Sequence, residues 1–286
     1  MKHNSADGIK IVVEKVRVEG KGVILLTGPS SCGKGEVAKA LCRFLSIPSH
    51  KHLSMGDILR NTVQKARQER SFRHRLAEEY HISNRTSIFE PEENKPDIME
   101  KALLYKAELI KTLKLKEDFV SQLDWLEFCV ARGLLVPDEW TVKILDALLE
   151  HSPEYHEGII ILDGYPRTKV AAEFLLQTLD KLNIPVIKVL HLSITKEEMK
   201  KRALGRKRLD DDEDSLERRY QFYIDKVQPC IEYLKYSLGN SAVALIDANQ
   251  PVYREPGQVD IEASVGQVLL SVMEALGLPR YLLDLK

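Results

Sequence analysis

The sequence is poor in cysteine, and it has no excess of charge of either sign. Its four cysteines are scattered (Cys32, Cys42, Cys129 and Cys230), so they form neither a disulfide framework nor the C-x-x-C spacing of a zinc site. The 42 lysines and arginines nearly balance the 43 acidic residues, which argues against a dedicated nucleic-acid binder. Apolar runs of bilayer-spanning length and a signal-peptide start are also missing. These absences predict a cytoplasmic protein with no nucleic-acid or membrane partner.

Short, continuous apolar runs alternate with helical patterns along much of the chain. The runs lie at 23–26, 158–162, 184–192 and 242–247. Runs without polar alternation are typical of parallel strands that are buried on both faces. The segments predicted as helices between them include 33–45, 168–182, 195–203 and 214–236. Two of these helices start with capping-box patterns, at Thr195 and at Asp214. The order of elements predicts an α/β fold with a doubly wound parallel sheet.

Residues 61–130 carry no strand signal and predict a helical lobe inserted between the first two core strands. A basic helix is expected at about 61–80, with Phe72, Leu76 and Tyr80 on one face. A second helix is expected to be capped by Asp97, and 119–131 supplies a third. Outside this lobe we expect a short strand or hairpin at 9–19 and a closing helix near 263–276.

The stretch GPSSCGKGE, from Gly28 to Glu36, follows the first apolar run and opens the first helix. A strand, then Gly-x-x-x-x-Gly-Lys, then a helix is the context of a phosphate-binding loop. Successive backbone N–H groups form an anion site, the helix N-terminus adds its dipole, and Lys34 supplies positive charge. A simple glycine turn between strand and helix is the alternative interpretation. The two correctly spaced glycines and the lysine favour phosphate binding.

Four more blocks follow the loop, and the set resembles the adenylate kinase family of nucleoside monophosphate kinases. The blocks are LSMGDILR (53–60), GLLVPDE (133–139), LDGYPRT (162–168) and RALGRKRLDDDEDSLERRY (202–220). Gly35, where most phosphate loops have Ser or Thr, is also similar to that family, whose loop reads G-x-P-G-x-G-K-G-T. The resemblance covers about 20–240 except the helical insertion, and it implies a five-stranded P-loop core, a monophosphate-binding lobe and a short lid.

The resemblance also implies the division of the chain. It gives an N-terminal extension (1–22), a core (23–53 and 151–248, with the lid at about 202–215), a helical lobe (54–150, with the insertion at about 61–130) and a C-terminal helix that completes the core (249–286).

Transfer of a phosphoryl group from ATP to a monophosphate needs positioning and charge neutralisation more than a general base. The catalytic residues implied are Lys34, Arg167, Arg208 and Arg219. The implied ATP contacts are Gly28, Pro29, Ser30, Ser31, Cys32, Gly33, Lys34, Gly35, Glu36, Arg202 and Arg206. The implied monophosphate contacts are Ser54, Met55, Arg60, Leu134, Val136, Gly164, Arg167 and Ala171. Asp163 is implied to hold Mg²⁺ through water, because that ion sheds its hydration shell reluctantly.

Three positions depart from the family pattern. Glu36 stands where the family has Thr, and a carboxylate there repels the donor phosphates unless it turns away or helps to hold a cation. Met55 replaces the Thr or Ala that borders the acceptor. Ala171 replaces the amide side chain that reads the acceptor base, so the base is left open: AMP is the default, and UMP, CMP or a deoxynucleotide is the nearest variant.

Two classes of function fit these residues. The first is a reversible, Mg²⁺-dependent nucleoside monophosphate kinase. The second is a nucleotide-binding regulatory protein in which Glu36, Met55 and Ala171 have weakened turnover and the insertion contacts a protein partner. Cationic residues matched to both substrates, such as Lys34, Arg60 and Arg167, favour the enzyme.

Overall fold

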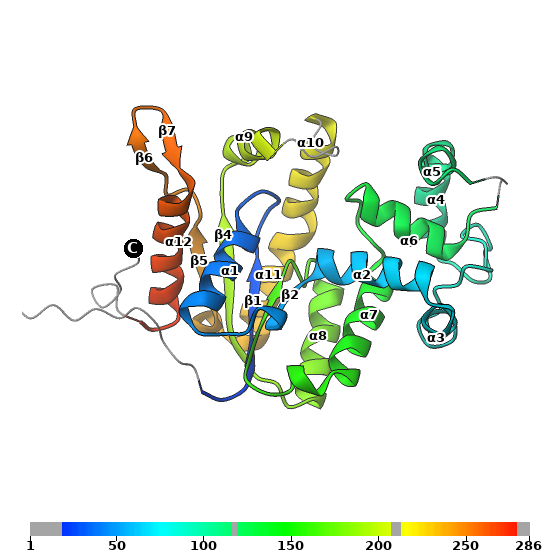
Figure 1. Cartoon of the computed structure of the whole chain (residues 1–286), viewed down its shortest axis with the longest axis horizontal. Helices are drawn as coiled ribbons and strands as arrows, with labels where there is room; N and C mark the ends of the chain where they lie inside the picture. Colours follow the sequence, from blue (N-terminus) through cyan, green and yellow to red (C-terminus); the bar gives the residue numbers. More distant parts are fainter. Residues whose placement is uncertain (1–18, 116–118, 207–212, 279–286) are drawn as a thin grey trace, which may run out of the picture.

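A five-stranded sheet forms the centre of the computed structural model, which describes residues 19–115, 119–206 and 213–278 (Figure 1). All its neighbouring strands are parallel, and their order is β2-β3-β1-β4-β5. The strands are β1 (Gly22–Thr27), β2 (His52–Ser54), β3 (Ile159–Asp163), β4 (Val186–Ser193) and β5 (Val243–Asp247). The predicted α/β fold class is confirmed.

The central strand β1 is buried completely, and its side chains divide between two hydrophobic clusters. Val23 and Leu25 belong to one cluster, whereas Ile24 and Leu26 belong to the other. The first cluster includes residues of α8 (Lys169–Lys181) and α11 (Gln228–Leu238), and the second includes those of α1 (Lys34–Phe44) and α12 (Ile261–Ala275). The helix after β1 and the helix after β3 therefore cover opposite faces. A crevice opens at the carboxyl end of the sheet where such connections diverge.

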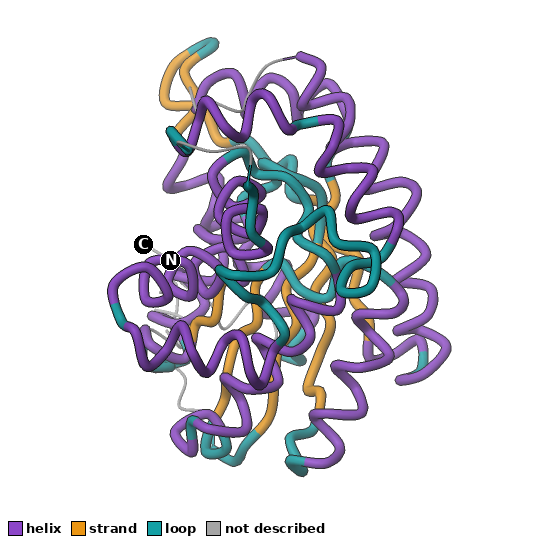
Figure 2. Tube along the Cα trace, turned by 90° about the vertical axis from the view of Figure 1, so that its right-hand side faces the viewer, coloured by secondary structure: helices purple, strands orange, loops and turns teal. Residues whose placement is uncertain are grey.

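A helical region projects from one side of the sheet between β2 and β3 (Figure 1). Its helices are α2 (Met55–Gln68), α3 (Arg70–Tyr80), α4 (Pro96–Leu104), α5 (Lys106–Leu113), α6 (Gln122–Ala131) and α7 (Asp138–His151). Figure 2 shows the loops that connect them gathered on the face turned toward the viewer. The absence of strands from 61–130 is confirmed for the described residues.

The sequence prediction was wrong about how many helices fill this region and where they begin. The helix expected at 61–80 is broken at Glu69, and the second is broken at Tyr105. Asp97 does not cap α4, because Pro96 already occupies the first helical position. Leu53 and Ser54 lie in the three-residue strand β2, which was not predicted because a strand that short leaves no alternation to detect.

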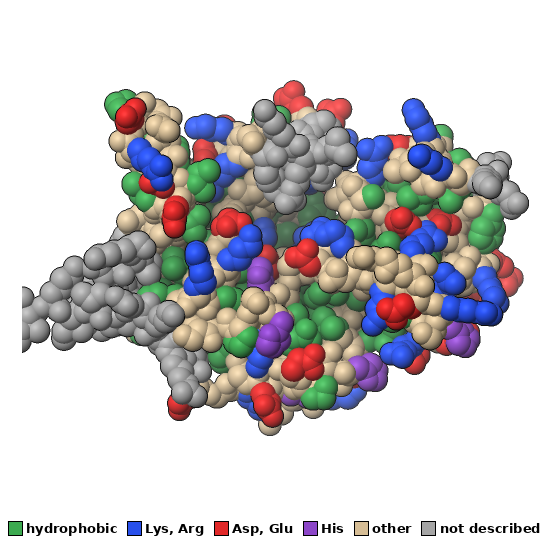
Figure 3. Space-filling model, viewed as in Figure 1, with side chains coloured by type: hydrophobic (Ala, Val, Ile, Leu, Met, Phe, Trp, Pro, Cys, Tyr) green, Lys and Arg blue, Asp and Glu red, His purple; other side chains and the backbone are tan. Residues whose placement is uncertain are grey.

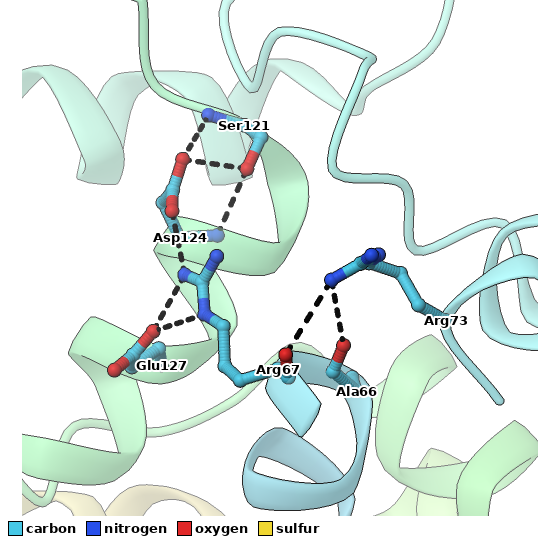
Figure 4. A network of polar contacts seen from close by, with 6 residues as sticks. All are labelled: Ala66, Arg67, Arg73, Ser121, Asp124 and Glu127. Carbon is cyan, nitrogen blue, oxygen red and sulfur yellow. Dashed lines mark hydrogen bonds and ion pairs between the residues drawn. The ribbon is translucent and has the colours of Figure 1, made fainter. Parts of the chain in front are cut away.

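Arg67 of α2 binds two carboxylates of α6, the last helix of the insertion (Figure 4). Its guanidinium lies 2.6 Å from Asp124 Oδ1 and 2.5 Å from Glu127 Oε2, both on α6. Burial opposes its charge, but hydrogen bonds to both carboxylates raise the pKa of Arg67. Asp124 is fixed in turn, since it forms a capping box with Ser121 at the start of α6. The insertion is thus joined to α2 by charge-assisted hydrogen bonds as well as by apolar packing.

The chain after β4 differs from the prediction in two places. The helix expected at 214–236 is α10 (Glu213–Phe222), a π-helical stretch (Tyr223–Val227) and then α11, and Asp214 lies inside the first turn rather than at the cap. Thr195 does accept a hydrogen bond from Glu198 N, ahead of α9 (Lys196–Arg206). A hairpin of β6 (Val252–Glu255) and β7 (Gln258–Asp260) was not predicted, although Pro256-Gly257 is a turn signal. The closing helix near 263–276 is confirmed by α12.

Short 3₁₀ turns complete the description. They are Ser49–Lys51, Pro153–Tyr155 and Asn240–Ala242. The strand expected at 9–19 lies almost wholly outside the described residues. Within the described ranges, every helix is too short or too polar to cross a bilayer.

All four cysteines are buried as free thiols. Burial raises the pKa of Cys42, and it raises the pKa values of Cys129 and Cys230 to about 12. Cys32 lies within the phosphate loop and is 2% exposed.

Candidate active site

The carboxyl ends of three neighbouring strands bring the predicted site residues to one edge of the sheet. In the strand register, Asp163 of β3 pairs with Leu26 of β1 on one side and with Ser54 of β2 on the other. The phosphate loop follows β1 directly. A Cβ atom added at Gly35 would lie 3.9 Å from Asp163 Oδ2, so this carboxylate faces the first turn of α1. The edge therefore combines an anion-binding loop with a buried carboxylate.

The phosphate loop folds around the side chain of its own lysine. Lys34 Nζ donates to the carbonyl oxygens of Gly28 (3.1 Å) and Pro29 (2.7 Å). Ser31 and Gly33 have positive φ angles of 60° and 90°, and Gly33 precedes α1 without a side-chain cap. The buried Ser31 hydroxyl finds no partner among the described residues. A loop with an uncapped helix N-terminus and an unused hydroxyl is suited to hold an anion.

Gly28 is required where the loop passes β4. Its φ is +142°, and an added Cβ would lie 2.3 Å from the Leu192 carbonyl oxygen, a backbone atom that cannot yield easily. We expect Gly28→Ala to lower the free energy of unfolding by about 3 kcal/mol, measured by urea denaturation. Gly33→Ala is the matched control, because its Cβ would meet no atom within 4 Å and only its φ of +90° adds strain. We expect about 1 kcal/mol there, and equal losses at both glycines would contradict the close approach.

Arg167 follows β3 and lies close enough to Asp163 for the two charges to interact. Its Nε donates to the Gly164 carbonyl at 2.8 Å, within the turn that leaves β3. Surrounding protein atoms lower the pKa of Arg167, the nearby Asp163 opposes that shift, and the positive charge of Arg219 adds to it. The side chain is nevertheless exposed to solvent. A guanidinium that is enclosed by protein yet open to water lies in a concave site, and Figure 3 shows a hollow between the core and the helical region.

The remaining predicted cations come from both sides of this hollow. Arg60, on α2, is 57% exposed and donates to Asp57 at 2.6 Å. Arg202, on α9, donates to Glu198 at 2.8 Å and to the Ala248 carbonyl at 3.0 Å, so it lies beside the end of β5. Arg219 lies on α10. Arg206 ends α9, and Arg208 lies outside the described residues together with most of the lid sequence.

The positions predicted to border the acceptor base offer apolar side chains. Met55 and Val136 are 3% and 4% exposed, and Leu134 is half-buried. Ala171 is fully buried, its amide donates to Thr168 Oγ1, and its carbonyl accepts from the Tyr165 hydroxyl at 3.4 Å. In this conformation the Ala171 methyl group presents no surface to a ligand. The side chains at these positions therefore offer no hydrogen-bonding group.

Glu36 turns away from the phosphate loop. Its side chain is 59% exposed and forms an ion pair with Lys39, one turn along α1, at 2.9 Å. Of the alternatives raised by the sequence, the structure favours a carboxylate directed to solvent. Its repulsion of a bound phosphate is then weakened by water and by the lysine.

Two histidines that the sequence suggested were structural or exposed lie at this edge. His52 Nε2 lies 3.4 Å from Asp163 Oδ2. His191 is buried in β4, where Nδ1 lies 2.8 Å from Thr27 Oγ1 and Nε2 lies 2.9 Å from the Tyr223 hydroxyl. Thr27 is the residue before the phosphate loop, so this chain of hydrogen bonds supports the loop from beneath. The only sequence signal for the role of His191 is its position inside the apolar run 184–192.

Acid should weaken the native state through His191. Burial lowers the pKa of His191 to about 4, and the charges of Lys34 and Lys235 add to the effect, whereas an unfolded imidazole titrates near 6.5. Between these values the unfolded chain binds a proton that the native state does not, so the free energy of unfolding falls as pH drops, by about 3 kcal/mol in full. We expect His191→Gln to lose this part of the decline, measured by urea denaturation at pH 7 and pH 4.5. Parallel declines in both proteins would contradict it.

These features define a P-loop phosphotransferase: a parallel sheet, a phosphate loop at its carboxyl edge, and cations around a cleft. Comparison with known proteins supports this class. The adenylate kinase family model matches residues 124–238. The adenylate kinase of Alkaliphilus oremlandii is 26% identical over 89% of this chain and 98% of its own length, and that of Cyanothece is 28% identical over 80% and 88%. That of Mycobacteroides abscessus is 37% identical over a shorter stretch, 40% of this chain and 63% of its own length.

Over most of its length the chain is similar to adenylate kinases. It is a nucleoside monophosphate kinase, and so a phosphotransferase.

Proposed function

We propose that this enzyme transfers the γ-phosphoryl group of ATP reversibly to AMP, with Mg²⁺ as cofactor. The observation that carries the proposal is the meeting of Asp163 and Arg167 with the phosphate loop at one edge of the sheet. The family supports a nucleotide acceptor, and the names of the relatives support AMP in particular. A cytoplasmic location, predicted from the sequence, stays a prediction.

The proposed roles follow from the position of each group. Lys34 and the amides of the loop bind the donor phosphates, and Lys34 would exchange its contacts with Gly28 and Pro29 for phosphate oxygens. Arg167 binds the acceptor phosphate from the core side, and Arg60 binds it from α2. Arg202 and Arg219, on α9 and α10, neutralise the charge of the transferring group, and the sequence resemblance assigns the same role to Arg206 and Arg208. The acceptor phosphate is itself an anionic nucleophile, so a general base is not needed.

The side chains at this edge of the sheet fit a Mg²⁺ ion. Asp163 has a side chain that is 11% exposed and that faces the first turn of α1, where the donor phosphates are proposed to bind. Among the described residues there is no cluster of three or more metal-binding side chains. One carboxylate plus substrate phosphates suits an ion that keeps most of its water. Bound there, the ion would offset the negative charge of the phosphates, and His52 would orient the carboxylate.

The helical region and the lid are proposed to close over the substrates and exclude water, which prevents loss of the phosphoryl group to hydrolysis. The predicted division of the chain at residue 150 stays a proposal. Three polar contacts join α7 to the segment that starts at β3: Thr168 with Asp138, Thr178 with Asp146 and Lys181 with Glu150. These contacts hold α7 against α8, so we infer that α2 to α6 supply most of the movement.

One observation favours a broader acceptor range than AMP alone. The buried methyl group of Ala171 leaves the base edge without an amide partner, and side-chain hydrogen bonding gives the strongest discrimination between bases. UMP, CMP and deoxynucleotides are therefore the second candidate acceptors. Backbone groups of Leu134 and Val136 are proposed to contact the base instead.

A coupled assay with ATP, Mg²⁺ and a panel of monophosphates tests the proposal. We expect turnover with AMP, lost when EDTA removes the metal, with less than a hundredfold preference over the other monophosphates. A nucleotide-binding regulatory protein would bind ATP in calorimetry yet turn over none of the panel. That result would overturn the proposed function and leave the insertion as a partner surface, as the alternative holds.

A further inference from the structure

Two lysines of the insertion, Lys101 in α4 and Lys95 just before it, contact the α6–α7 loop and the first turn of α7, respectively. Lys101 Nζ donates to the Leu135 carbonyl at 3.1 Å, and Lys95 Nζ lies 2.5 Å from Glu139 Oε2. Lys101 is half-buried, whereas Lys95 is 66% exposed. The contact of Lys101 is therefore the stronger of the two, because exposed ion pairs contribute little.

The loop has a second attachment on the same side. Leu134 N donates to the Cys129 carbonyl at 2.8 Å, at the end of α6. Ile98 and Ala102 of α4 share a hydrophobic cluster with Phe128 and Cys129 of α6. The Lys101 ammonium is close enough to oppose the rise in the pKa of the Cys129 thiol. Lys101 thus lies where α4, α6 and the loop meet.

Holding the Leu135 carbonyl also sets the direction of the next amide. A trans peptide is planar, so the N–H of Val136 points opposite to the C=O of Leu135. With that oxygen directed toward Lys101, the Val136 N–H is directed away from α4. The structure shows no hydrogen bond from this N–H to any described residue, although the Val136 residue is 4% exposed. An oriented, unused backbone donor beside Leu134 is suited to an acceptor atom of a nucleobase.

We propose that Lys101 is a positioning residue that orients the Val136 amide toward the acceptor base and so sets the affinity for the monophosphate. This inference rests on the proposed function, since it assigns the acceptor side to the loop. It gives the helical insertion a role within the enzyme: α4 prepares the base-binding loop in advance. A loop that is ordered in advance loses less conformational entropy when the substrate binds.

The test compares Lys101→Met, Lys101→Arg and the exposed α5 residue Lys111→Met with the wild type. For Lys101→Met we expect KM for AMP to rise about fivefold, with kcat and KM for ATP within about twofold, because the lost interaction acts on acceptor binding. Lys101→Arg retains a charged donor and should restore KM, and Lys111→Met should leave it unchanged. An unchanged KM for AMP in Lys101→Met would overturn the inference. Equal losses of kcat/KM for AMP and for ATP, together with a lower Tm, would also overturn it.

Hydrogen exchange of the substrate-free protein separates this inference from the proposed function. We expect faster exchange of the amides of 134–136 in Lys101→Met than in the wild type and in Lys111→Met. If the wild type phosphorylated no monophosphate, the proposed function would fail, and the role in acceptor affinity would fail with it. Unchanged exchange would overturn the role of Lys101 in holding the loop, whatever the activity.

Discussion

Replacing Arg167 with methionine is expected to lower kcat/KM for the monophosphate by about a thousandfold, the largest effect of any substitution considered. Arg167 lies close enough to Asp163 for the two charges to interact, and the Arg219 charge adds to the field there. Methionine keeps the length of the side chain and removes both the charge and the bidentate donors. Initial rates with AMP varied at saturating ATP measure the effect.

The control for Arg167 is Lys169→Met, two residues along the chain. Lys169 is 60% exposed and pairs only loosely with Glu173, at 3.7 Å. We expect activity within twofold of the wild type. Full activity in Arg167→Met would contradict a role for Arg167 in the active site.

The second large effect is expected at Lys34. We expect Lys34→Met to lower kcat by two to three orders of magnitude and to weaken ATP binding in calorimetry, since the loop keeps its amides but loses its cation. Lys39→Met, on the exposed face of the same helix, is the matched control, and it breaks only the pair with Glu36. Equal losses in the two variants would mean that net charge, rather than the position of Lys34, supports turnover.

The parallel core could be predicted because its strands are buried on both faces and read as apolar runs of four or more residues. The register of β1 with β3 and β4 did not follow from the sequence, since long helical connections separate these strands along the chain. The three residues of β2 gave no such signal, and the hairpin β6–β7 is mostly exposed, with strands of only four and three residues. Breaks at Glu69 and Tyr105 were also missed, since neither residue is a glycine or a proline and the helical period runs through both.

Motif spacing could predict that the phosphate loop and Asp163 lie at the same edge of the sheet, because the carboxyl ends of neighbouring parallel strands meet there. Contacts between distant segments could not be predicted. Lys101 lies 34 residues before Leu135, and nothing in the sequence pairs them. Likewise, the burial of Ala171 and the outward turn of Glu36 depend on packing and rotamers rather than on local pattern. The roles of the site residues themselves await the measurements described above.

The burial of every thiol has a practical consequence. A maleimide reacts with a thiolate that it can reach, so the native protein should resist labelling, most of all at Cys129 and Cys230, where the pKa is also high. Cys129 lies at the end of α6 in the helical region, Cys230 in α11 of the core, and Cys32 in the phosphate loop. The natural sequence thus carries chemical reporters in three separate parts of the molecule, each reacting at the rate at which its surroundings open.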